Sequence, residues 1–278
     1  MKRNPVGTWN CGPTIRTKDY LEADVPILSE VLFAVELALL HATPLYYGLG
    51  VPHGDGSAVI LVPAFLCPDA YLMPMHQWLA RIGYNPFLSG IGFNTDCPNL
   101  LIRGQLNKTI EKALAKSGRK VHLIGHSLGG IIARAIAAQR PADIASVTTL
   151  GAPFRGTVAH RSILRAAEMV RHRILVKHGV GVLPDCYTGH CTCDFLESLS
   201  RTMPASVLET AVYSEGDGVV DWRYCMTDHS ESDFRVSGTH IGLAFNPSVY
   251  SIIATRLALA HSEKSKRKNQ PSVTIQRH

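Results

Sequence analysis

The 278-residue sequence has no run of 18 uninterrupted apolar residues, the length at which a segment becomes a candidate membrane span. Charged residues make up only 18% of the chain and hydrophobic residues 46%, which excludes an intrinsically disordered chain. Its seven cysteines are too few for a disulfide scaffold of this length. What remains is a globular chain with a large apolar core, in one large domain or two small ones.

The net charge of +6 is concentrated in two segments. Residues 154–178 carry +5 and residues 261–278 carry +4, so the rest of the chain is mildly acidic. A general nucleic-acid-binding protein needs its basic face on the fold itself. We therefore expect no nucleic-acid partner, and we interpret residues 261–278 as a basic flexible tail.

Residues 1–57 are expected to form an N-terminal extension to the main domain. Its first apolar run, Ile27–Ala42, contains Glu30 and Glu36, and the hydrophobic region of a secretory signal does not tolerate such charges. The run predicts an amphipathic helix packed on the main domain. With no signal peptide and no membrane span, we expect a cytoplasmic chain, with secretion after removal of a leader as the alternative.

Between residues 58 and 260, short apolar runs alternate with longer segments of helical periodicity. This alternation predicts an α/β fold, with a mostly parallel sheet and helices on both of its faces. The expected strands are residues 58–63, 85–91, 121–124, 146–150, 207–213 and 233–236. The expected helices are residues 69–82, 100–117, 128–139, 162–177 and 247–260.

An insertion, residues 154–204, separates two of these strands. It is about fifty residues long, whereas a crossover between parallel strands needs only about a dozen. We expect it to form a helical cap or lid on the main domain. Its helix, residues 162–177, has a basic face and an apolar face, so two interpretations stay open. In the first interpretation the helix lies against an anionic lipid surface, and in the second it is the solvated part of a fixed cap.

The strongest local motif is Gly125-His-Ser-Leu-Gly-Gly130, which follows an expected strand and opens an expected helix. A G-x-S-x-G string in this context is typical of a nucleophile elbow, where a sharp turn exposes the serine hydroxyl. The turn needs small residues two positions before and after Ser127, and Gly125 and Gly129 supply them. We expect the side chain of His126 to point elsewhere. The alternative is an ordinary glycine-rich turn.

A serine nucleophile needs a histidine base that is oriented by a carboxylate, in the chain order serine, acid, histidine. Asp217 and His240 each follow an expected strand at its carboxyl end, where sites assemble in α/β sheets. Asp221 is the rival acid and His229 the rival base. Asp217 is favoured because it comes first after its strand, and His229 is disfavoured because it precedes the last strand.

Four sequence blocks, given at the end of this paragraph, resemble those of α/β-hydrolase-fold lipases and carboxylesterases, especially small bacterial lipases. The resemblance covers roughly residues 59–259. The resemblance implies that Ser127 is the nucleophile, Asp217 the orienting acid and His240 the base, with no cofactor and no metal. The matching blocks are Gly125-His-Ser-Leu-Gly-Gly130, Leu150-Gly-Ala-Pro-Phe-Arg-Gly-Thr157, Tyr213-Ser-Glu-Gly-Asp-Gly-Val-Val220 and Gly238-Thr-His-Ile-Gly-Leu243.

The sequence departs from this family after the first core strand. Such lipases usually carry His-Gly there, and the next residue gives one backbone N–H to the oxyanion. Here the chain reads Val62-Pro-Ala-Phe65. We expect the N–H of Phe65 to serve in that place and the N–H of Leu128 to be the second donor of the oxyanion hole.

The expected function is therefore hydrolysis of carboxylic esters, with a small-molecule or lipid ester as substrate and peripheral contact with a lipid surface as a further possibility. An acyltransferase that uses the same triad is one alternative. The other is a non-catalytic binding protein of the same fold that uses its basic cap and tail. The oligomeric state is not predicted.

Four of the cysteines lie in the cap and just beyond it. Cys186, Cys191 and Cys193 stand close together with His190, and Cys225 follows the candidate acid. A zinc site is one interpretation, although no Cys-x2-Cys pair is present. A disulfide between the cap and the loop of Cys225 is a second, and free thiols are the third.

Overall fold

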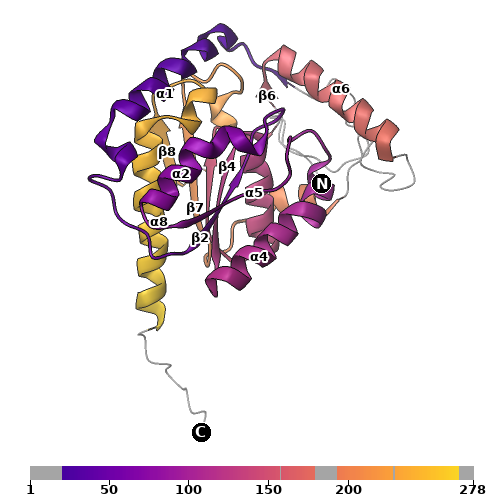
Figure 1. Ribbon diagram of the computed structural model, residues 1–278. Helices are drawn as coiled ribbons and strands as arrows, with labels where there is room; N and C mark the ends of the chain where they lie inside the picture. The colour runs from indigo at the N-terminus through magenta and orange to yellow at the C-terminus, as the bar shows by residue number, and fades with distance from the viewer. Residues whose placement is uncertain (1–20, 157, 179–192, 228, 269–278) are drawn as a thin grey trace.

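The computed structural model describes residues 21–156, 158–178, 193–227 and 229–268. Its centre is a six-stranded sheet in the order β3-β2-β4-β5-β7-β8, in which every neighbouring pair is parallel (Figure 1). The predicted α/β architecture is confirmed. The strands are β2 (Ala58–Val62), β3 (Asn85–Leu88), β4 (Val121–His126), β5 (Ile144–Leu150), β7 (Leu208–Ser214) and β8 (Asp233–Val236).

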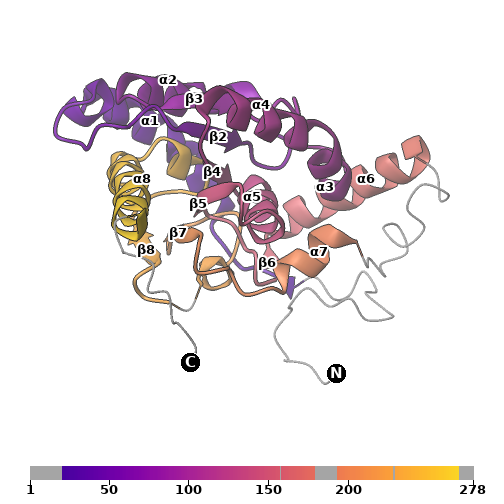
Figure 2. The same ribbon diagram turned by 90° about the horizontal axis from the view of Figure 1, so that it is seen from below.

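Helices cover both faces of this sheet (Figure 2). Those that pack with the sheet into one core are α4 (Asn107–Ser117), α5 (Leu128–Gln139) and α7 (Asp194–Leu199). Those that share the other core are α1 (Phe33–Ala42), α2 (Met73–Arg81) and α8 (Pro247–Lys268).

Strand β2 shows how one short apolar run serves both cores. Ala58, Ile60 and Val62 lie in the core with α4, α5 and α7, while Val59 and Leu61 lie in the core with α1, α2 and α8. All five side chains are fully buried. A parallel strand that is covered on both faces is apolar at every position, which is why β2 shows no polar alternation.

Two predicted helices are less regular than their sequence pattern indicates. The segment expected at residues 69–82 begins as a 3-10 turn, η3 (Asp69–Leu72), and continues as α2. The segment expected at residues 100–117 consists of a short helix, α3 (Pro98–Leu101), a π-helical segment, η4 (Ile102–Leu106), and α4. The extra residue per turn in η4 does not change the apolar spacing enough to be visible in the sequence.

The predicted insertion contains the expected helix, α6 (Arg161–His178). Before it, β6 (Val158–Ala159) pairs in parallel with β1 (Leu21–Glu22) to form a second, two-stranded sheet. After it, α7 packs into the main core through Phe195, Leu196 and Leu199, so the end of the expected cap belongs to the main domain. Cys186, Cys191 and the intervening His190 lie outside the described residues.

The N-terminal apolar run forms the 3-10 segment η1 (Ile27–Leu32) followed by α1. A helix is present and packs on the domain, but it is not amphipathic in the expected sense, with its apolar side inward and its charged side in solvent. The buried or half-buried side chains include Glu30 and Glu36, whose carboxylates accept hydrogen bonds from the main domain. The exposed side chains are apolar except for His41 and comprise Leu28, Val31, Leu32, Ala34, Val35, Ala38, Leu39, His41 and Ala42.

The chain end also differs from expectation. Helix α8 continues to Lys268, so the first part of the expected flexible tail, residues 261–268, is helical. Lysine and arginine are good helix formers, and positive charge is favourable at a helix C-terminus, which explains the extension. Residues 269–278 lie outside the described part. No helix among the described residues has the length and apolarity to cross a membrane.

Candidate active site

Ser127 occupies the sharp turn between β4 and α5, with φ 53° and ψ −124°. A serine at positive φ is strained by about 1–3 kcal/mol and persists only where the surroundings fix it. Here the Ser127 N–H donates to the carbonyl oxygen of Leu150 at the end of β5 (2.8 Å). The side chain therefore stands at the carboxyl edge of the sheet.

The glycines on either side of Ser127 are required by close backbone contacts, as the sequence predicts. A Cβ on Gly125 would lie 2.2 Å from the carbonyl oxygen of Gly129. A Cβ on Gly129 would lie 2.3 Å from the carbonyl oxygen of Val62. The start of α5 is thus pressed against the ends of β2 and β4, and any side chain would push it away.

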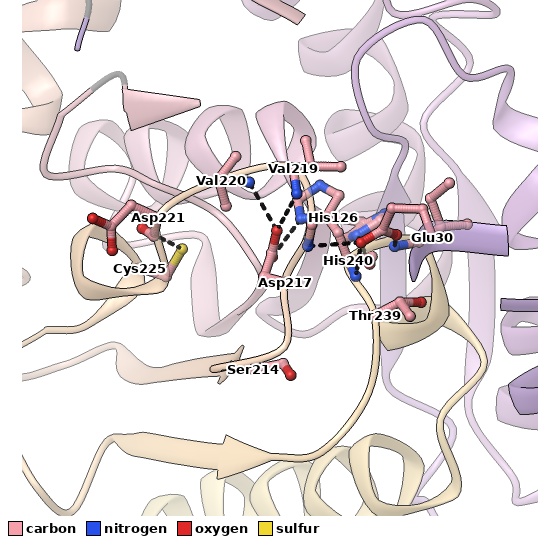
Figure 3. A network of polar contacts seen from close by, with 12 residues as sticks. Glu30, His126, Ser214, Asp217, Val219, Val220, Asp221, Cys225, Thr239 and His240 are labelled. Atoms are coloured by element: carbon pink, nitrogen blue, oxygen red, sulfur yellow. Dashed lines mark hydrogen bonds and ion pairs between the residues drawn. The ribbon is translucent and has the colours of Figure 1, made fainter. Parts of the chain in front are cut away.

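Asp217 and His240 are hydrogen-bonded to each other (Figure 3). Asp217 Oδ2 accepts from His240 Nδ1 at 2.6 Å, while Asp217 Oδ1 accepts from the N–H groups of Val219 and Val220, each at 2.8 Å. Asp217 is 2% and His240 4% exposed. Because Nδ1 keeps its proton and donates it in a hydrogen bond to the carboxylate, Nε2 of the neutral imidazole is left as the acceptor that a general base needs.

The rival residues are placed elsewhere. Asp221 starts the 3-10 turn η6 (Trp222–Cys225), where its carboxylate accepts from the N–H of Arg223 at 3.0 Å and forms an ion pair with the guanidinium. His229 is exposed. Of the two candidate acids, Asp217 is the one that contacts His240.

Two opposing effects act on the pKa of His240. Burial lowers it, but the carboxylates of Asp217 and Glu30 raise it by more, so the pKa lies above the ordinary histidine value of 6.5. The imidazolium that a general base becomes on taking a proton is therefore stabilised at this position.

His126, which sequence analysis set aside, contacts His240 directly. Its Nε2–H donates to the carbonyl oxygen of His240 at 2.8 Å, and its Nδ1 accepts from the hydroxyl of Tyr71. The two imidazole rings are 4.8 Å apart between centroids. Burial and the neighbouring His240 hold the pKa of His126 well below its ordinary value, so this ring stays neutral.

Two N-terminal carboxylates also reach this region and were missed as site residues. Glu30, 6% exposed, accepts hydrogen bonds from the backbone of the loops that carry Asp217 and His240. Glu36 accepts from the N–H and the hydroxyl of Thr239. The available signal was the presence of two carboxylates inside the apolar run Ile27–Ala42.

The loop after β2 lies against the start of α5. A Cβ on Gly129 would lie 2.4 Å from the carbonyl oxygen of Pro63, which shows how close the two segments are. Asn94 fixes this loop in two ways. Its side-chain Nδ2 donates to Pro63 O (2.7 Å), and its backbone carbonyl oxygen accepts from the Leu66 N–H (3.1 Å). Asn94 was not identified from the sequence.

The two expected oxyanion donors belong to these neighbouring segments. Leu128 is the first residue of α5, and the N–H groups of a first turn have no carbonyl partner within the helix. Phe65 precedes Leu66, whose φ of 62° turns the chain sharply at this point. The Leu128 N–H thus lies at the start of α5, directly after Ser127, and the Phe65 N–H lies on the loop after β2.

Among the described residues no group of three or more His, Cys, Asp and Glu side chains is arranged to hold a metal ion. Cys225 is a free thiol, 1% exposed, with Sγ 4.0 Å from the carbonyl oxygen of Asp221. Cys225 therefore forms no disulfide with another cysteine of the described residues.

Comparisons with known proteins agree with this architecture. The family model described as alpha/beta hydrolase fold matches residues 102–170, which include the serine turn and α5. Two curated relatives are triacylglycerol lipases, from Pseudarthrobacter phenanthrenivorans and Burkholderia plantarii. Each is 50% identical over 109 residues and 36% of this chain. The alignment spans only 34% and 30% of these lipases, about a third of their length.

Solved structures show the same fold at low identity. A monoglyceride lipase from Saccharomyces cerevisiae aligns with a TM-score of 0.51 at 15% identity, over 76% of this chain and 90% of that one. A monoacylglycerol lipase from Paleococcus ferrophilus aligns with a TM-score of 0.50 at 15% identity, over 74% and 97%. The chain has the alpha/beta hydrolase fold, and part of it is homologous to triacylglycerol lipases.

Proposed function

We propose that this chain hydrolyses carboxylic esters through an acyl-enzyme on Ser127, with His240 as the base and Asp217 as the acid that orients it. The observation that carries the proposal is the buried hydrogen bond of 2.6 Å between Asp217 and His240. It occurs at the same sheet edge as a serine in a strained, positive-φ turn. Strain of this kind is concentrated at functional sites.

In the proposed reaction, Ser127 Oγ attacks the acyl carbon while His240 Nε2 takes the hydroxyl proton. The tetrahedral oxyanion is bound by the N–H groups of Phe65 and Leu128, each worth about 3–4 kcal/mol by analogy with a known oxyanion donor. The alcohol leaves with the proton from His240. Water then attacks the acyl-enzyme while His240 takes its proton, and the acid is released as His240 returns the proton to Ser127 Oγ.

The proposed substrates are lipid esters, on the basis of the partial homology with triacylglycerol lipases. We also propose that the chain contacts a lipid surface. The apolar solvent-facing side of η1 and α1 supports this contact, since Leu28 is 84% and Val31 70% exposed. Large apolar surfaces of this kind mark interaction sites. Met169 and Val176 on the basic helix α6 are similarly exposed.

The test is the hydrolysis of p-nitrophenyl esters with acyl chains from about two to sixteen carbons by the full chain and by Ser127→Ala. We expect turnover by the wild type and a loss of about 10⁴-fold or more in the variant. Equal turnover by the two proteins would contradict the proposal. Added acceptor alcohol with product analysis shows whether the acyl group passes to water or to alcohol.

A further inference from the structure

We propose that Glu30 is a positioning residue for this reaction, whose carboxylate locks the backbone of His240 and Asp217 into one arrangement. The inference rests on the proposed function, because it concerns the geometry of the proposed base. Glu30 lies in the N-terminal segment η1, about 200 residues away from its partners in the sequence.

The contacts of Glu30 join the two loops that carry the acid and the base (Figure 3). Its Oε1 accepts from the N–H of Gly218 (2.8 Å), next to Asp217, and from the N–H of His240 itself (2.9 Å). Its Oε2 accepts from the N–H of Ile241 (2.8 Å). One buried carboxylate thus fixes the separation of the two loops from a third segment.

The fit around this carboxylate is close. A Cβ on Gly218 would lie 2.7 Å from Glu30 Oε1 and 2.7 Å from the carbonyl oxygen of Pro26. A buried carboxylate is costly unless its oxygens are satisfied, and here three backbone N–H groups satisfy them. These three hydrogen bonds therefore fix the Glu30 carboxylate and, at the same time, fix the two loops whose N–H groups donate them.

His240 is held at both ends of its backbone. Glu30 accepts from its N–H, while His126 Nε2–H donates to its carbonyl oxygen. Only the side chain is left for the reaction, and Asp217 orients that side chain at Nδ1. A displacement of about 1 Å in a reacting group can cost about 100-fold in rate, so a clamp of this kind is catalytically important.

Glu30 also acts on His240 by its charge. The groups that face His240 are Asp217, Glu30 and the neutral ring of His126, with Glu36 one residue away on Thr239. The Asp217 carboxylate and, to a smaller extent, the Glu30 carboxylate raise the pKa of His240. A glutamine at this position would keep the size of the side chain but remove the charge.

Glu36 provides a matched control. It comes from the same N-terminal element, and it too holds the histidine loop, by accepting from Thr239 N (3.1 Å) and Thr239 Oγ1 (2.6 Å). Its hydrogen bonds go to Thr239 and not to the backbone of His240. Glu30→Gln and Glu36→Gln therefore make the same change, a carboxylate to an amide. They differ in that Glu30 accepts a hydrogen bond from the backbone of His240, whereas Glu36 accepts from Thr239.

The experiment measures kcat, KM and the pH profile of kcat/KM for both variants. For Glu30→Gln we expect kcat to fall about 10- to 100-fold with KM changed little, and the acid limb of the profile to move to lower pH. For Glu36→Gln we expect no movement of the limb. If the limb of Glu30→Gln stays at the wild-type position, or if both variants move it equally, the inference is wrong.

A second measurement does not depend on turnover. The imidazole of His240 is titrated by NMR in Ser127→Ala and in Ser127→Ala with Glu30→Gln, and we expect a lower pKa in the second protein. If Glu30→Gln does not fold, Glu30→Asp keeps the charge on a shorter side chain and should lower kcat without moving the limb. An inactive wild type contradicts the proposed function, whereas an active wild type with an unaltered titration contradicts this inference alone.

Discussion

Two aspartates stand four residues apart after β7, and their hydrogen-bond partners distinguish them. The carboxylate of Asp217 accepts three hydrogen bonds, two from backbone N–H groups and one from the imidazole of His240. Asp221 accepts from Arg223 at the start of a turn. The difference in partners predicts a difference in the effect of the same substitution.

We expect Asp217→Asn to lower kcat about 10⁴-fold, because an amide opposite Nδ1 favours the wrong imidazole tautomer. Asp221→Asn removes a partly exposed ion pair and should change kcat less than about threefold. Steady-state kinetics on one p-nitrophenyl ester compares the two. A larger loss in Asp221→Asn would transfer the role of the acid to Asp221.

The pKa of His240 predicts the pH dependence. The proposed base works as neutral imidazole, so kcat/KM should rise with pH, with a midpoint above 6.5 because Asp217 and Glu30 outweigh the effect of burial. The contribution of His240 to the stability of the fold has the opposite pH dependence, because it falls as pH rises. A raised pKa in the folded state adds stability below the unfolded value, and this contribution is lost as pH rises through the folded pKa. A midpoint below 6.5 in the rate profile would contradict this account.

At the scale of elements, the serine turn depends on how closely α5 approaches β2 and β4. Gly129→Ala would place a Cβ 2.3 Å from Val62 O, and we expect a loss of stability of about 2 kcal/mol or more with a disturbed site. Gly104→Ala is the control, since no heavy atom lies within 4 Å of its added Cβ. It should be neutral or stabilising by about 0.5–1 kcal/mol. Urea unfolding of the two variants measures both effects.

The turn and the elements around it could be predicted because their signals are local. The spacing of Gly125, Ser127 and Gly129 requires a strand before it and a helix after it, and the predicted helix 128–139 agrees with α5 residue for residue. The apolar runs predicted five further strands with errors of a few residues at their ends. Parallel pairing then followed from the lengths of the crossovers.

The residues that hold the site were not predictable in the same way. Glu30 pairs with His240 across 210 positions, and no local pattern announces such a contact. Two carboxylates in an apolar run indicated that the run is not a signal peptide. They did not indicate that the polar face turns inward, because periodicity alone does not say which face of a helix is covered. Asn94 is another residue whose partner, Pro63, lies far along the chain.

At the scale of the whole molecule, the apolar outer face of η1 and α1 is the feature that most needs a partner. It lies on an element whose inner face contacts the histidine loop, and Ile241 in that loop is 36% exposed. A lipid surface bound there would lie next to the proposed site. We therefore expect the chain to co-sediment with phosphatidylcholine vesicles.

The double variant Val31→Gln with Val35→Gln should weaken this association about tenfold or more, since each exposed valine contributes roughly 1.5 kcal/mol when it is buried. Leu259→Gln is the control, because Leu259 is an exposed apolar residue (38%) on α8. Equal binding by the double variant and the wild type would locate the lipid contact elsewhere. Dimers seen by light scattering, and lost in the double variant, would identify a second copy as the partner.

The central claim is that Ser127 is a nucleophile activated by His240, and covalent labelling tests it most directly. The full chain is treated with a fluorophosphonate and the modified residue is identified by tandem mass spectrometry, with His240→Ala as the control. We predict one adduct, on Ser127, formed at least about 10³-fold more slowly in His240→Ala. An adduct on another residue, or equal labelling of Ser127 in the two proteins, would contradict the account.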